Sequence, residues 1–362
     1  MYYEENYWSN YGNNLCNMHN GGGVQPLISD ISVSAETTSD ELSYGDYLKY
    51  QKIDEDDDGT YDYIRITDCD ESATEIEIPG EIDGLKVTVI GASAFSGCPN
   101  LASVNIPDGV TLIGSCAFDY CTSLVNISIP NSVTFIGNMA FEGCTSLTSI
   151  NIPNHITSIY LSTFYDCISL SNITIPDGVT NIGRCAFDNC TSLTSINIPN
   201  SVTNIDALAF ESCINLTNII VPKSVTNINY GAFASCKNLE SITIKNPKCV
   251  IYDDKATISN ICDFDNDEIS FNGTIYGYEN STAQAYAEKY GYKFEALEPE
   301  NEIVSGDITG NGKIDLYDAI DICKYIMGMK TFTEEEMKIA DFDGNGRVDL
   351  YDVIGIAKTL LG

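Results

Sequence analysis

The chain has 362 residues, of which 52 are acidic and 18 are basic, giving a formal net charge of −34. A surface of this charge repels phosphate backbones and anionic lipids, so the composition argues against nucleic acid and membrane surfaces as partners. No run of about 18 apolar residues occurs, so no segment is expected to span a bilayer. The acidity suits calcium, cationic partners, or solubility alone.

Residues 1–35 are rich in Asn, Gly and aromatic residues and are expected to form a disordered leader or the remnant of a secretion signal. The small residues at 32–35 have the pattern of a cleavage site after Ala35, although neither a basic nor an apolar region precedes them. This pattern is interpreted as the end of a secretion signal in a gene whose start is mis-called. The alternative is that the match is accidental.

Residues 36–89 contain short alternating runs and are predicted to form an N-terminal β cap. Within this cap, residues 54–65 begin like a calcium loop but carry Arg65 at position 12, where a carboxylate is required. An acidic hairpin turn is therefore expected, with calcium binding as the alternative. The carboxylates at loop positions 1, 3, 5 and 9 are Asp54, Asp56, Asp58 and Asp62.

A period of 23 residues dominates residues 90–245. The unit reads C-x-x-L-x-x-I-x-I-P-x-x-V-T-x-I-G-x-x-A-F-x-x. A unit of this length cannot bury its own apolar face, so the units are expected to stack into a β-solenoid. Two of the columns that the period creates are Phe95, Phe118, Phe141, Phe164, Phe187, Phe210 and Phe233, and Cys98, Cys121, Cys144, Cys167, Cys190, Cys213 and Cys236.

Each unit is expected to contain two short strands and one or two helical turns. Ile150 and Ile152 alternate with polar residues, as in a strand, and Pro153 ends that strand because it has no N–H. Residues 133–136 have the pattern of the second strand, and the Gly-x-x-Ala-Phe-x-x-Cys segment provides the helical turns. The cysteines should form a buried, reduced column rather than disulfides or a metal site, since residues at one phase do not surround an ion.

The string Ala-Phe-x-x-Cys-x-x-Leu-x-x-Ile-x-Ile-Pro resembles the BspA-like leucine-rich repeats of bacterial surface and secreted proteins. The resemblance covers roughly residues 85–245 and implies a binding scaffold without identifying its ligand. Rows of Ser, Asn and Thr face outward from the predicted strands. They are interpreted either as a solvated sheet surface or as a binding surface for a protein or a polysaccharide.

Residues 246–298 are predicted to be a C-terminal cap, and residues 299–304 a polar linker. Within the cap, a strand is expected at 274–278 and a returning strand at 292–294. A short helix is expected between them, at 282–290, because a Ser precedes it and a Gly follows it.

Two 12-residue segments near the C-terminus follow the calcium-loop pattern, with oxygen ligands at positions 1, 3, 5, 9 and 12, a backbone carbonyl at 7 and Gly at 6. Oxygen-only ligands at this spacing select a hard cation of calcium's size, so two Ca²⁺ ions are expected. The second loop has one more carboxylate than the first and is predicted to bind more tightly. The predicted ligands are Asp307, Thr309, Asn311, Lys313 (carbonyl), Asp315 and Asp318 in the first loop, and Asp341, Asp343, Asn345, Arg347 (carbonyl), Asp349 and Asp352 in the second.

Amphipathic helices are expected after the two loops, at 319–327 and 353–361, with a short capped helix opening at 333–336 between them. A loop and helix duplicated in this way resembles the type I dockerin module, and the resemblance covers residues 305–362. It implies a small all-α, calcium-binding domain that binds a cohesin domain on a scaffoldin protein of a cellulosome. The positions that match the family's recognition residues are Leu316, Tyr317 and Lys324, and Leu350, Tyr351 and Lys358.

The alternative role for the leucines and tyrosines at these positions is mutual packing of the two helices. The two copies agree there, so binding in two orientations is a further hypothesis. Replacing both tyrosines is then predicted to weaken cohesin binding much more than replacing either one.

No catalytic motif accompanies these modules. The two histidines are His19 and His155, and no nucleophile elbow, histidine metal pair or phosphate loop occurs. The sequence therefore predicts an α+β chain with a capped leucine-rich-repeat β-solenoid followed by a dockerin. The predicted function is that of a non-catalytic, secreted, cellulosome-associated component. The alternatives are an adhesin that anchors a substrate or cell surface to the complex, and a polysaccharide-degrading enzyme of unfamiliar type.

Overall fold

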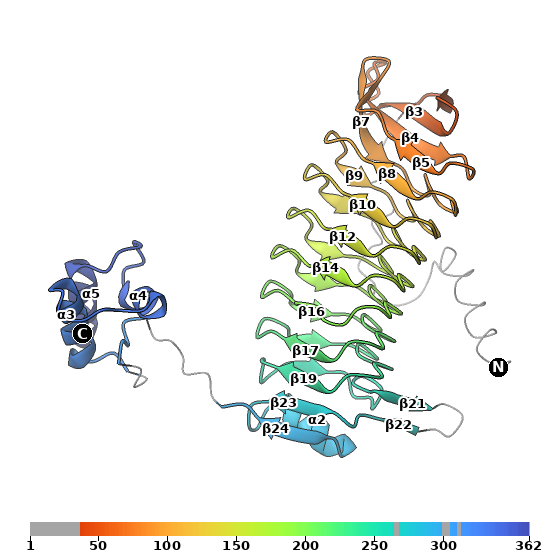
Figure 1. Ribbon diagram of the computed structural model, residues 1–362. Coiled ribbons are helices and arrows are strands. Elements are labelled where there is room, and N and C mark those ends of the chain that lie inside the picture. The colour runs from red at the N-terminus through yellow and green to blue at the C-terminus, as the bar shows by residue number, and fades with distance from the viewer. Residues whose placement is uncertain (1–36, 264–267, 299–304, 310–312, 362) are drawn as a thin grey trace. The chain divides into compact units, whose positions relative to one another are not determined.

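The structure is a computed structural model that describes residues 37–263, 268–298, 305–309 and 313–361. The chain divides into two compact units, Met1–Ala296 and Leu297–Gly362 (Figure 1). The first unit is a β-solenoid with a cap at each end, and the second is a small helical unit. The predicted leader (1–35), the predicted linker (299–304) and Asn311 lie outside the described residues.

The N-terminal cap is a set of mostly antiparallel strands joined to the first turn of the solenoid. Strand β3 pairs antiparallel with β1, β2 and β4, and β4 then pairs in parallel with β7. Because β7 also pairs in parallel with the next solenoid strand, the cap covers an edge that would otherwise be open. The cap strands are β1 (Thr37–Thr38), β2 (Leu42–Tyr44), β3 (Leu48–Asp54), β4 (Tyr63–Cys69), β6 (Glu81–Ile82) and β7 (Leu85–Ile90).

The first parallel sheet of the solenoid contains the predicted I-x-I strands. Its register advances by one repeat between neighbours, as in the Asn126–Ser149 and Ile127–Ile150 pairs. The order is β14-β12-β10-β8-β5, and a second group, β17-β19-β23-β24, continues toward the C-terminus. These strands are β5 (Glu75–Glu77), β8 (Ser103–Asn105), β10 (Asn126–Ser128), β12 (Ser149–Asn151), β14 (Asn172–Thr174), β17 (Asn218–Val221), β19 (Ser241–Ile244), β23 (Thr274–Gly277) and β24 (Lys293–Ala296).

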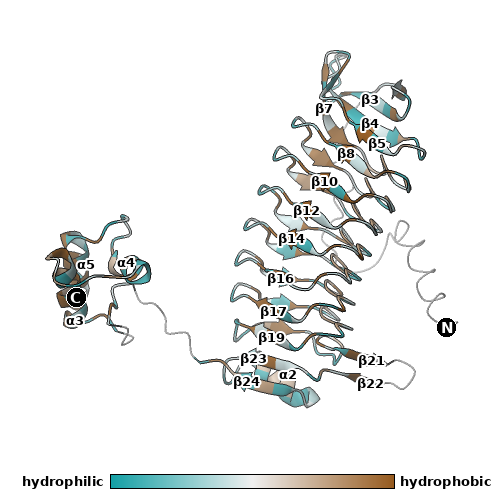
Figure 2. Cartoon of the chain, in the orientation of Figure 1, coloured by the Kyte–Doolittle hydropathy of each residue, from teal (hydrophilic) through white to brown (hydrophobic). Residues whose placement is uncertain are grey.

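The short strands predicted from the V-T-x-I segment form the second parallel side of the solenoid in two groups. One group, β9 and β11, continues the cap sheet, and the other has the order β13-β15-β16-β18-β20. Each of these strands except β20 places one Ile in the core and one partly buried residue on the outer side. The strands are β9 (Leu112–Ile113), β11 (Phe135–Ile136), β13 (Ser158–Ile159), β15 (Asn181–Ile182), β16 (Asn204–Ile205), β18 (Asn227–Ile228) and β20 (Val250–Ile251). Figure 2 shows apolar and polar residues alternating along the turns, as a two-sided coil of strands requires.

The third side of each turn is not helical, so the predicted helical turns are wrong. Between residues 45 and 263 the described chain contains no helix. The backbone instead bonds to the next turn, as in Phe118 N–H to Ala140 O (2.8 Å) and Tyr120 N–H to Glu142 O (2.7 Å). Residues in the left-handed region, among them Cys116 (φ 56°) and Tyr120 (φ 53°), bend the segment so that this pattern is possible.

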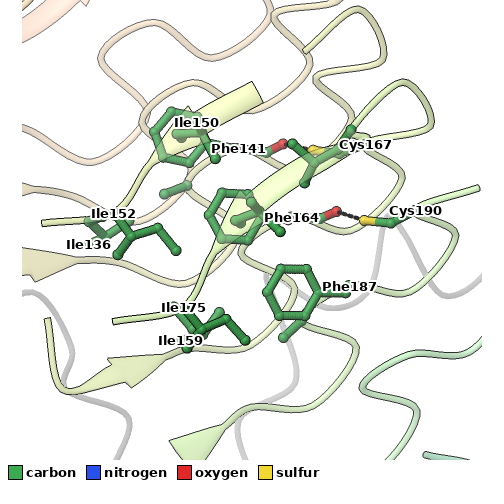
Figure 3. Close-up of a cluster of buried hydrophobic side chains, with 14 of the residues drawn as sticks. Ile136, Phe141, Ile150, Ile152, Ile159, Phe164, Cys167, Ile175, Phe187 and Cys190 are labelled. Atoms are coloured by element: carbon green, nitrogen blue, oxygen red, sulfur yellow. Dashed lines mark hydrogen bonds between the residues drawn. The ribbon is translucent and has the colours of Figure 1, made fainter. Parts of the chain in front are cut away.

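The core of the solenoid is a stack of fully buried phenylalanine rings. Neighbouring rings from Phe95 to Phe233 lie 4.9–5.7 Å apart between centroids and are nearly parallel. Figure 3 shows three of them, Phe141, Phe164 and Phe187, surrounded by isoleucines of both sheets. Burial of a side chain of this size contributes about 1.5–3 kcal/mol, so the stack is a principal source of stability.

The predicted buried column of reduced cysteines is confirmed, and it has a second role. From Cys121 to Cys236, each thiol donates to the carbonyl of the phenylalanine one turn earlier, as from Cys167 to Phe141 (3.2 Å) and from Cys190 to Phe164 (3.2 Å; Figure 3). The first thiol of the column, that of Cys98, donates to the carbonyl of Cys69 (3.6 Å). Burial raises the pKa of the Cys121 thiol to about 12, so the donor proton is retained. Cysteine therefore supplies both apolar volume and a donor for a buried carbonyl.

The C-terminal cap consists of α2 (Thr282–Tyr290) between β23 and β24, with a hairpin of β21 (Ile261–Asp263) and β22 (Glu268–Ser270) before it. Ser281 caps the helix through Gln284 N–H, and Gly291 ends it in the left-handed region (φ 72°). These bounds confirm the predicted helix. Thr282 also donates to the carbonyl of Cys249 (2.6 Å), which fixes the helix to the end of the solenoid.

The second unit contains α3 (Leu316–Ile326), α4 (Glu334–Ala340) and α5 (Leu350–Leu361). Helices α3 and α5 start three residues earlier than predicted, because Asp315 caps α3 and Asp318 completes a capping box. The predicted capping box of Thr333 and Glu336 at α4 is confirmed. The core is small and consists of Ile308, Ala319, Ile322, Ala340 and Ile356 with partly buried neighbours.

Among the helices of the described residues, none combines the length and apolarity that a membrane span requires.

Candidate functional site

The second predicted calcium loop brings three carboxylates together. Asp341, Asp343 and Asp352 each offer one oxygen, and these oxygens lie within 4.8 Å of one another. The loop holds them through its own backbone. Gly346 N–H donates to Asp341 Oδ2 (2.8 Å), and the N–H groups of Phe342 and Asp343 donate to Asp352 Oδ1.

The remaining ligands of this loop are held in the same manner. Asn345 Oδ1 accepts from Arg347 N–H (2.9 Å), and Asp349 Oδ1 accepts from Tyr351 N–H (2.7 Å). One side-chain oxygen in each case is thus fixed by the backbone. The loop is ordered around its carboxylates rather than around an apolar core.

A divalent cation suits this donor set. Asp341 Oδ1 is buried and has no hydrogen-bond partner, and an unpaired buried carboxylate oxygen is costly. The three neighbouring negative charges repel one another unless a cation lies between them. Oxygen-only ligands favour Ca²⁺ over softer metals, so the residues present fit calcium.

The first loop repeats the arrangement within the part that the structure describes. Asp318 is fully buried and accepts from Thr309 N–H (2.9 Å) and Asp315 N–H (2.7 Å), as Asp352 does in the second loop. Asp307 is also buried, and Thr309 donates its hydroxyl to it (3.2 Å). Thr309 thus supplies a neutral hydroxyl at the loop position where Asp343 supplies a carboxylate.

The predicted cohesin-contacting residues lie on the surface. Leu316 and Tyr317 are 66% and 70% exposed, and Leu350 and Tyr351 are 60% and 69% exposed. All four are absent from the core of this unit. The interpretation that they pack the two helices together is therefore wrong, and they are free to contact a partner.

Two apolar residues that the sequence analysis missed extend these surfaces. Ile320 and Ile354 are 38% and 39% exposed, and each lies four residues after the exposed leucine of its helix. Residues four apart share one face of a helix. The sequence carries a signal for them, because the pattern Leu-Tyr-x-x-Ile occurs at the start of both helices.

The two candidate contact surfaces differ in charge. Lys324 and Lys330 both bind Asp321, with Nζ–Oδ distances of 2.9 and 2.7 Å. The position equivalent to Asp321 is Gly355, where a Cβ would lie 2.6 Å from Phe342. Lys358 is exposed and has no such carboxylate on its own helix, so the repeat is close to symmetric in its apolar residues but not in its charges.

The acidic turn in the N-terminal cap also brings carboxylates together. Oxygens of Asp54, Asp56 and Asp58 lie within 4.8 Å of one another. Both oxygens of the buried Asp54 accept backbone N–H groups, from Asp58 (3.2 Å) and Gly59 (2.9 Å). These bonds account for the turn as the acidic hairpin connection expected between β3 and β4.

The outward face of the first sheet carries no charge between β8 and β19. Two outward positions in each turn hold only Ser, Asn, Thr or Ile, in a chain with 52 acidic residues. A shallow groove of about 370 Å³ lies on this face. Its lining includes Asn126, Ser149, Asn151, Asn172, Thr174 and Pro176.

Family comparisons identify both modules. The model of the BspA type leucine rich repeat region matches residues 68–190 and 157–272, with six copies. The model of the dockerin type I domain matches residues 305–361. No curated protein is significantly similar to the chain.

Solved structures of bacterial leucine-rich repeat proteins are similar to the first unit. One from Bacteroides ovatus ATCC 8483 is 23% identical, with 70% of this chain and 76% of that chain covered and a TM-score of 0.47. The T. pallidum protein TpLRR is 26% identical, with 70% and 97% covered and a TM-score of 0.39. One from Eubacterium ventriosum ATCC 27560 is 32% identical over 45% and 42% of the two chains, with a TM-score of 0.40.

The fold and the paired loops define a modular interaction protein, built from a repeat scaffold and a docking module. The repeat model covers more than half of the chain, which therefore belongs to the BspA type leucine-rich repeat family and carries a type I dockerin at residues 305–361. Both are non-catalytic module types, and type I dockerins bind calcium and cohesins.

Proposed function

We propose that the chain is a non-catalytic, secreted component of a cellulosome. Its tail binds two Ca²⁺ ions, one in each loop, and in that state docks on a cohesin domain of a scaffoldin. The observation that carries this proposal is the pairing of each carboxylate loop with an exposed Leu-Tyr pair at the start of the following helix.

Calcium and docking are coupled through the helix N-termini. Asp315 and Asp349 are loop ligands in the proposal, and each also accepts from the N–H of the neighbouring tyrosine (2.7 Å). An ion held by these aspartates therefore fixes the backbone that carries Tyr317 and Tyr351. Removing the ion frees the first turn of each helix, which is the segment that meets the partner.

The repeats supply a second binding surface in this proposal. The charge-free face of the first sheet suits a neutral polar ligand, either a glycan or an uncharged protein segment, since an anionic ligand meets the strongly acidic remainder of the chain. If that ligand belongs to a substrate or a cell surface, the chain acts as an adhesin. The alternative of a polysaccharide-degrading enzyme predicts turnover of plant polysaccharides by the purified full chain.

Capture on immobilised cohesin domains of the source organism tests the docking half of the proposal. The full chain should bind in Ca²⁺ and be released by EGTA. Tyr317→Ala and Tyr351→Ala should each weaken binding by no more than about threefold, whereas the double variant should lose about 30-fold or more, because hot-spot residues contribute about 2 kcal/mol or more.

Met329→Ala is the matched control for the tyrosine variants, because Met329 is 74% exposed and lies outside both Leu-Tyr-x-x-Ile surfaces. It should bind as the unaltered chain does. Equal losses in the single and double tyrosine variants would contradict the hypothesis that the two surfaces substitute for one another. A glycan array probed with the full chain separates a glycan ligand of the repeats from a protein ligand.

A further inference from the structure

Acidic side chains recur at one phase of the solenoid, directly after the buried phenylalanines. Consecutive rings such as Phe118 and Phe141 lie 5.4 Å apart, so the residues that follow them stack at a similar spacing. Tyr165 takes this position in the middle turn, where Asp166 follows it. We call Asp119, Glu142, Asp166, Asp188 and Glu211 the carboxylate column.

These carboxyl groups are withdrawn from water and lack cationic partners. Asp188 is only 3% exposed, and the other four are partly buried. Asp119 Oδ1 is buried with no hydrogen-bond partner. None of the ion pairs between described residues includes a member of the column. Stacked carboxylates without counter-ions repel one another when all are ionised.

The groups that surround the column do not neutralise it. Asn189 donates its amide to Asp166, and this neutral donor bonds a single carboxyl. The phenols of Tyr120 and Tyr165 and the thiol of Cys185 lie close enough to interact electrostatically with it. The nearby cation is Arg184, which is exposed and acts on Cys185. Burial raises the pKa of the thiols behind the column, which therefore stay protonated. These thiols are Cys121, Cys144, Cys167, Cys190 and Cys213.

The surroundings favour the protonated form of each carboxyl. Burial raises the pKa of Asp119 to about 6 and that of Glu211 to about 7. Burial, with the charges of Asp119 and Asp166, raises the pKa of Glu142 to about 7. Burial and the charges of Glu211 and Asp166 raise the pKa of Asp188 well above its usual range.

We propose that the carboxylate column makes the solenoid a proton-dependent structure, in which the central turns are held most firmly in mildly acidic solution and open more readily at alkaline pH. Protonation removes the repulsion between stacked turns. Deprotonation leaves buried, unpaired charges in the same turns.

The direction of the effect follows from proton linkage. A carboxyl whose pKa is raised by folding binds more protons in the folded chain than in the unfolded chain, so the unfolding free energy falls as pH rises through the folded pKa. The unfolding free energy should therefore fall over a pH range that begins at the ordinary pKa of a carboxyl group and ends slightly above pH 7. The raised pKa values of Asp119, Glu142 and Glu211 set the upper end of this range.

Thermal unfolding of the full chain, followed by far-ultraviolet circular dichroism in excess Ca²⁺, tests the proposal. The midpoint of the solenoid transition should rise by several degrees between about pH 8 and about pH 5.5. The Glu142→Gln and Glu211→Gln double variant, nearly isosteric with the protonated pair, should unfold at a higher temperature than the unaltered chain at the alkaline pH. It should also lose at least half of the pH-dependent shift.

Asp108→Asn with Asp177→Asn is the matched control, since both carboxylates are exposed and lie in turns of the same solenoid outside the column. It removes the same charge and should keep the full pH-dependent shift, which separates the column from the general acidity of the chain. The proposal is overturned if the column variant keeps the shift of the unaltered chain, or if the control loses as much.

Amide hydrogen exchange on the unaltered chain gives an independent reading that needs no variant. After correction for intrinsic rates, residues 139–143 and 208–212 should exchange faster at the alkaline pH, relative to the N-terminal cap strands β3 and β4. Equal pH dependence in the cap and in these turns would contradict the proposal.

Discussion

The repeats and the tail stabilise their structures by different means. The solenoid buries a continuous row of phenylalanines, isoleucines and leucines, with backbone bonds from each turn to the next. Among its described residues, the tail buries five apolar side chains in its core, and its two loops contain seven aspartates. The comparison indicates that apolar burial and backbone bonds between turns stabilise the first unit, whereas the second unit has a small apolar core and is expected to depend on the calcium that type I dockerins bind.

The largest expected effect is therefore the response to chelation. With EGTA in excess, residues 305–361 should lose their helical circular dichroism and cohesin binding, because a ligand that binds only the folded state supplies folding free energy. The solenoid transition should be unchanged. Differential scanning calorimetry resolves the two transitions. A single transition that shifts as a whole on chelation would show that the two units do not unfold separately.

A substitution in the phenylalanine stack should destabilise the solenoid and leave the tail unchanged. Phe164 lies between Phe141 and Phe187 at ring distances of 5.7 and 5.5 Å. Phe164→Ala should lower the unfolding free energy of the solenoid by about 3–5 kcal/mol, because neighbouring turns cannot collapse into the cavity. Denaturant titration measures this loss, and the calcium-loaded tail should keep its own transition. Tyr120→Ala, at a residue that is 49% exposed, should lower the unfolding free energy much less.

The same comparison explains which parts of the fold can be predicted from the sequence. The 23-residue period identifies the Phe and Cys columns directly, because a residue at one phase of a solenoid has the same surroundings in every turn. The third side of the turn is predicted incorrectly as helical. Its conformation depends on bonds between turns and on left-handed residues such as Tyr120, which local propensity does not indicate.

Identical sequences in the repeats also show the limit of local prediction. The ten residues 144–153 recur as 190–199, yet Ser149–Asn151 forms β12 while residues 195–197 form no strand. Pairing depends on the positions of the neighbouring turns, which the ten residues do not encode. In the tail, the carboxylate spacing predicts the loops, but the earlier start of α3 follows from the cap at Asp315.

The smallest expected effect concerns the two loops of the tail. The first loop has Thr309 where the second has Asp343, so its carboxylate set is one charge smaller. The second loop should bind Ca²⁺ more tightly, and Thr309→Asp should tighten the first by about tenfold, or about 1.4 kcal/mol. Titration calorimetry on the full chain measures both Kd values. Asp343→Thr is the reciprocal control and should weaken the tighter site by a similar factor. If both variants leave the two Kd values unchanged, the number of carboxylates does not set the difference in Ca²⁺ affinity between the loops. Loop rigidity would then be the cause of that difference.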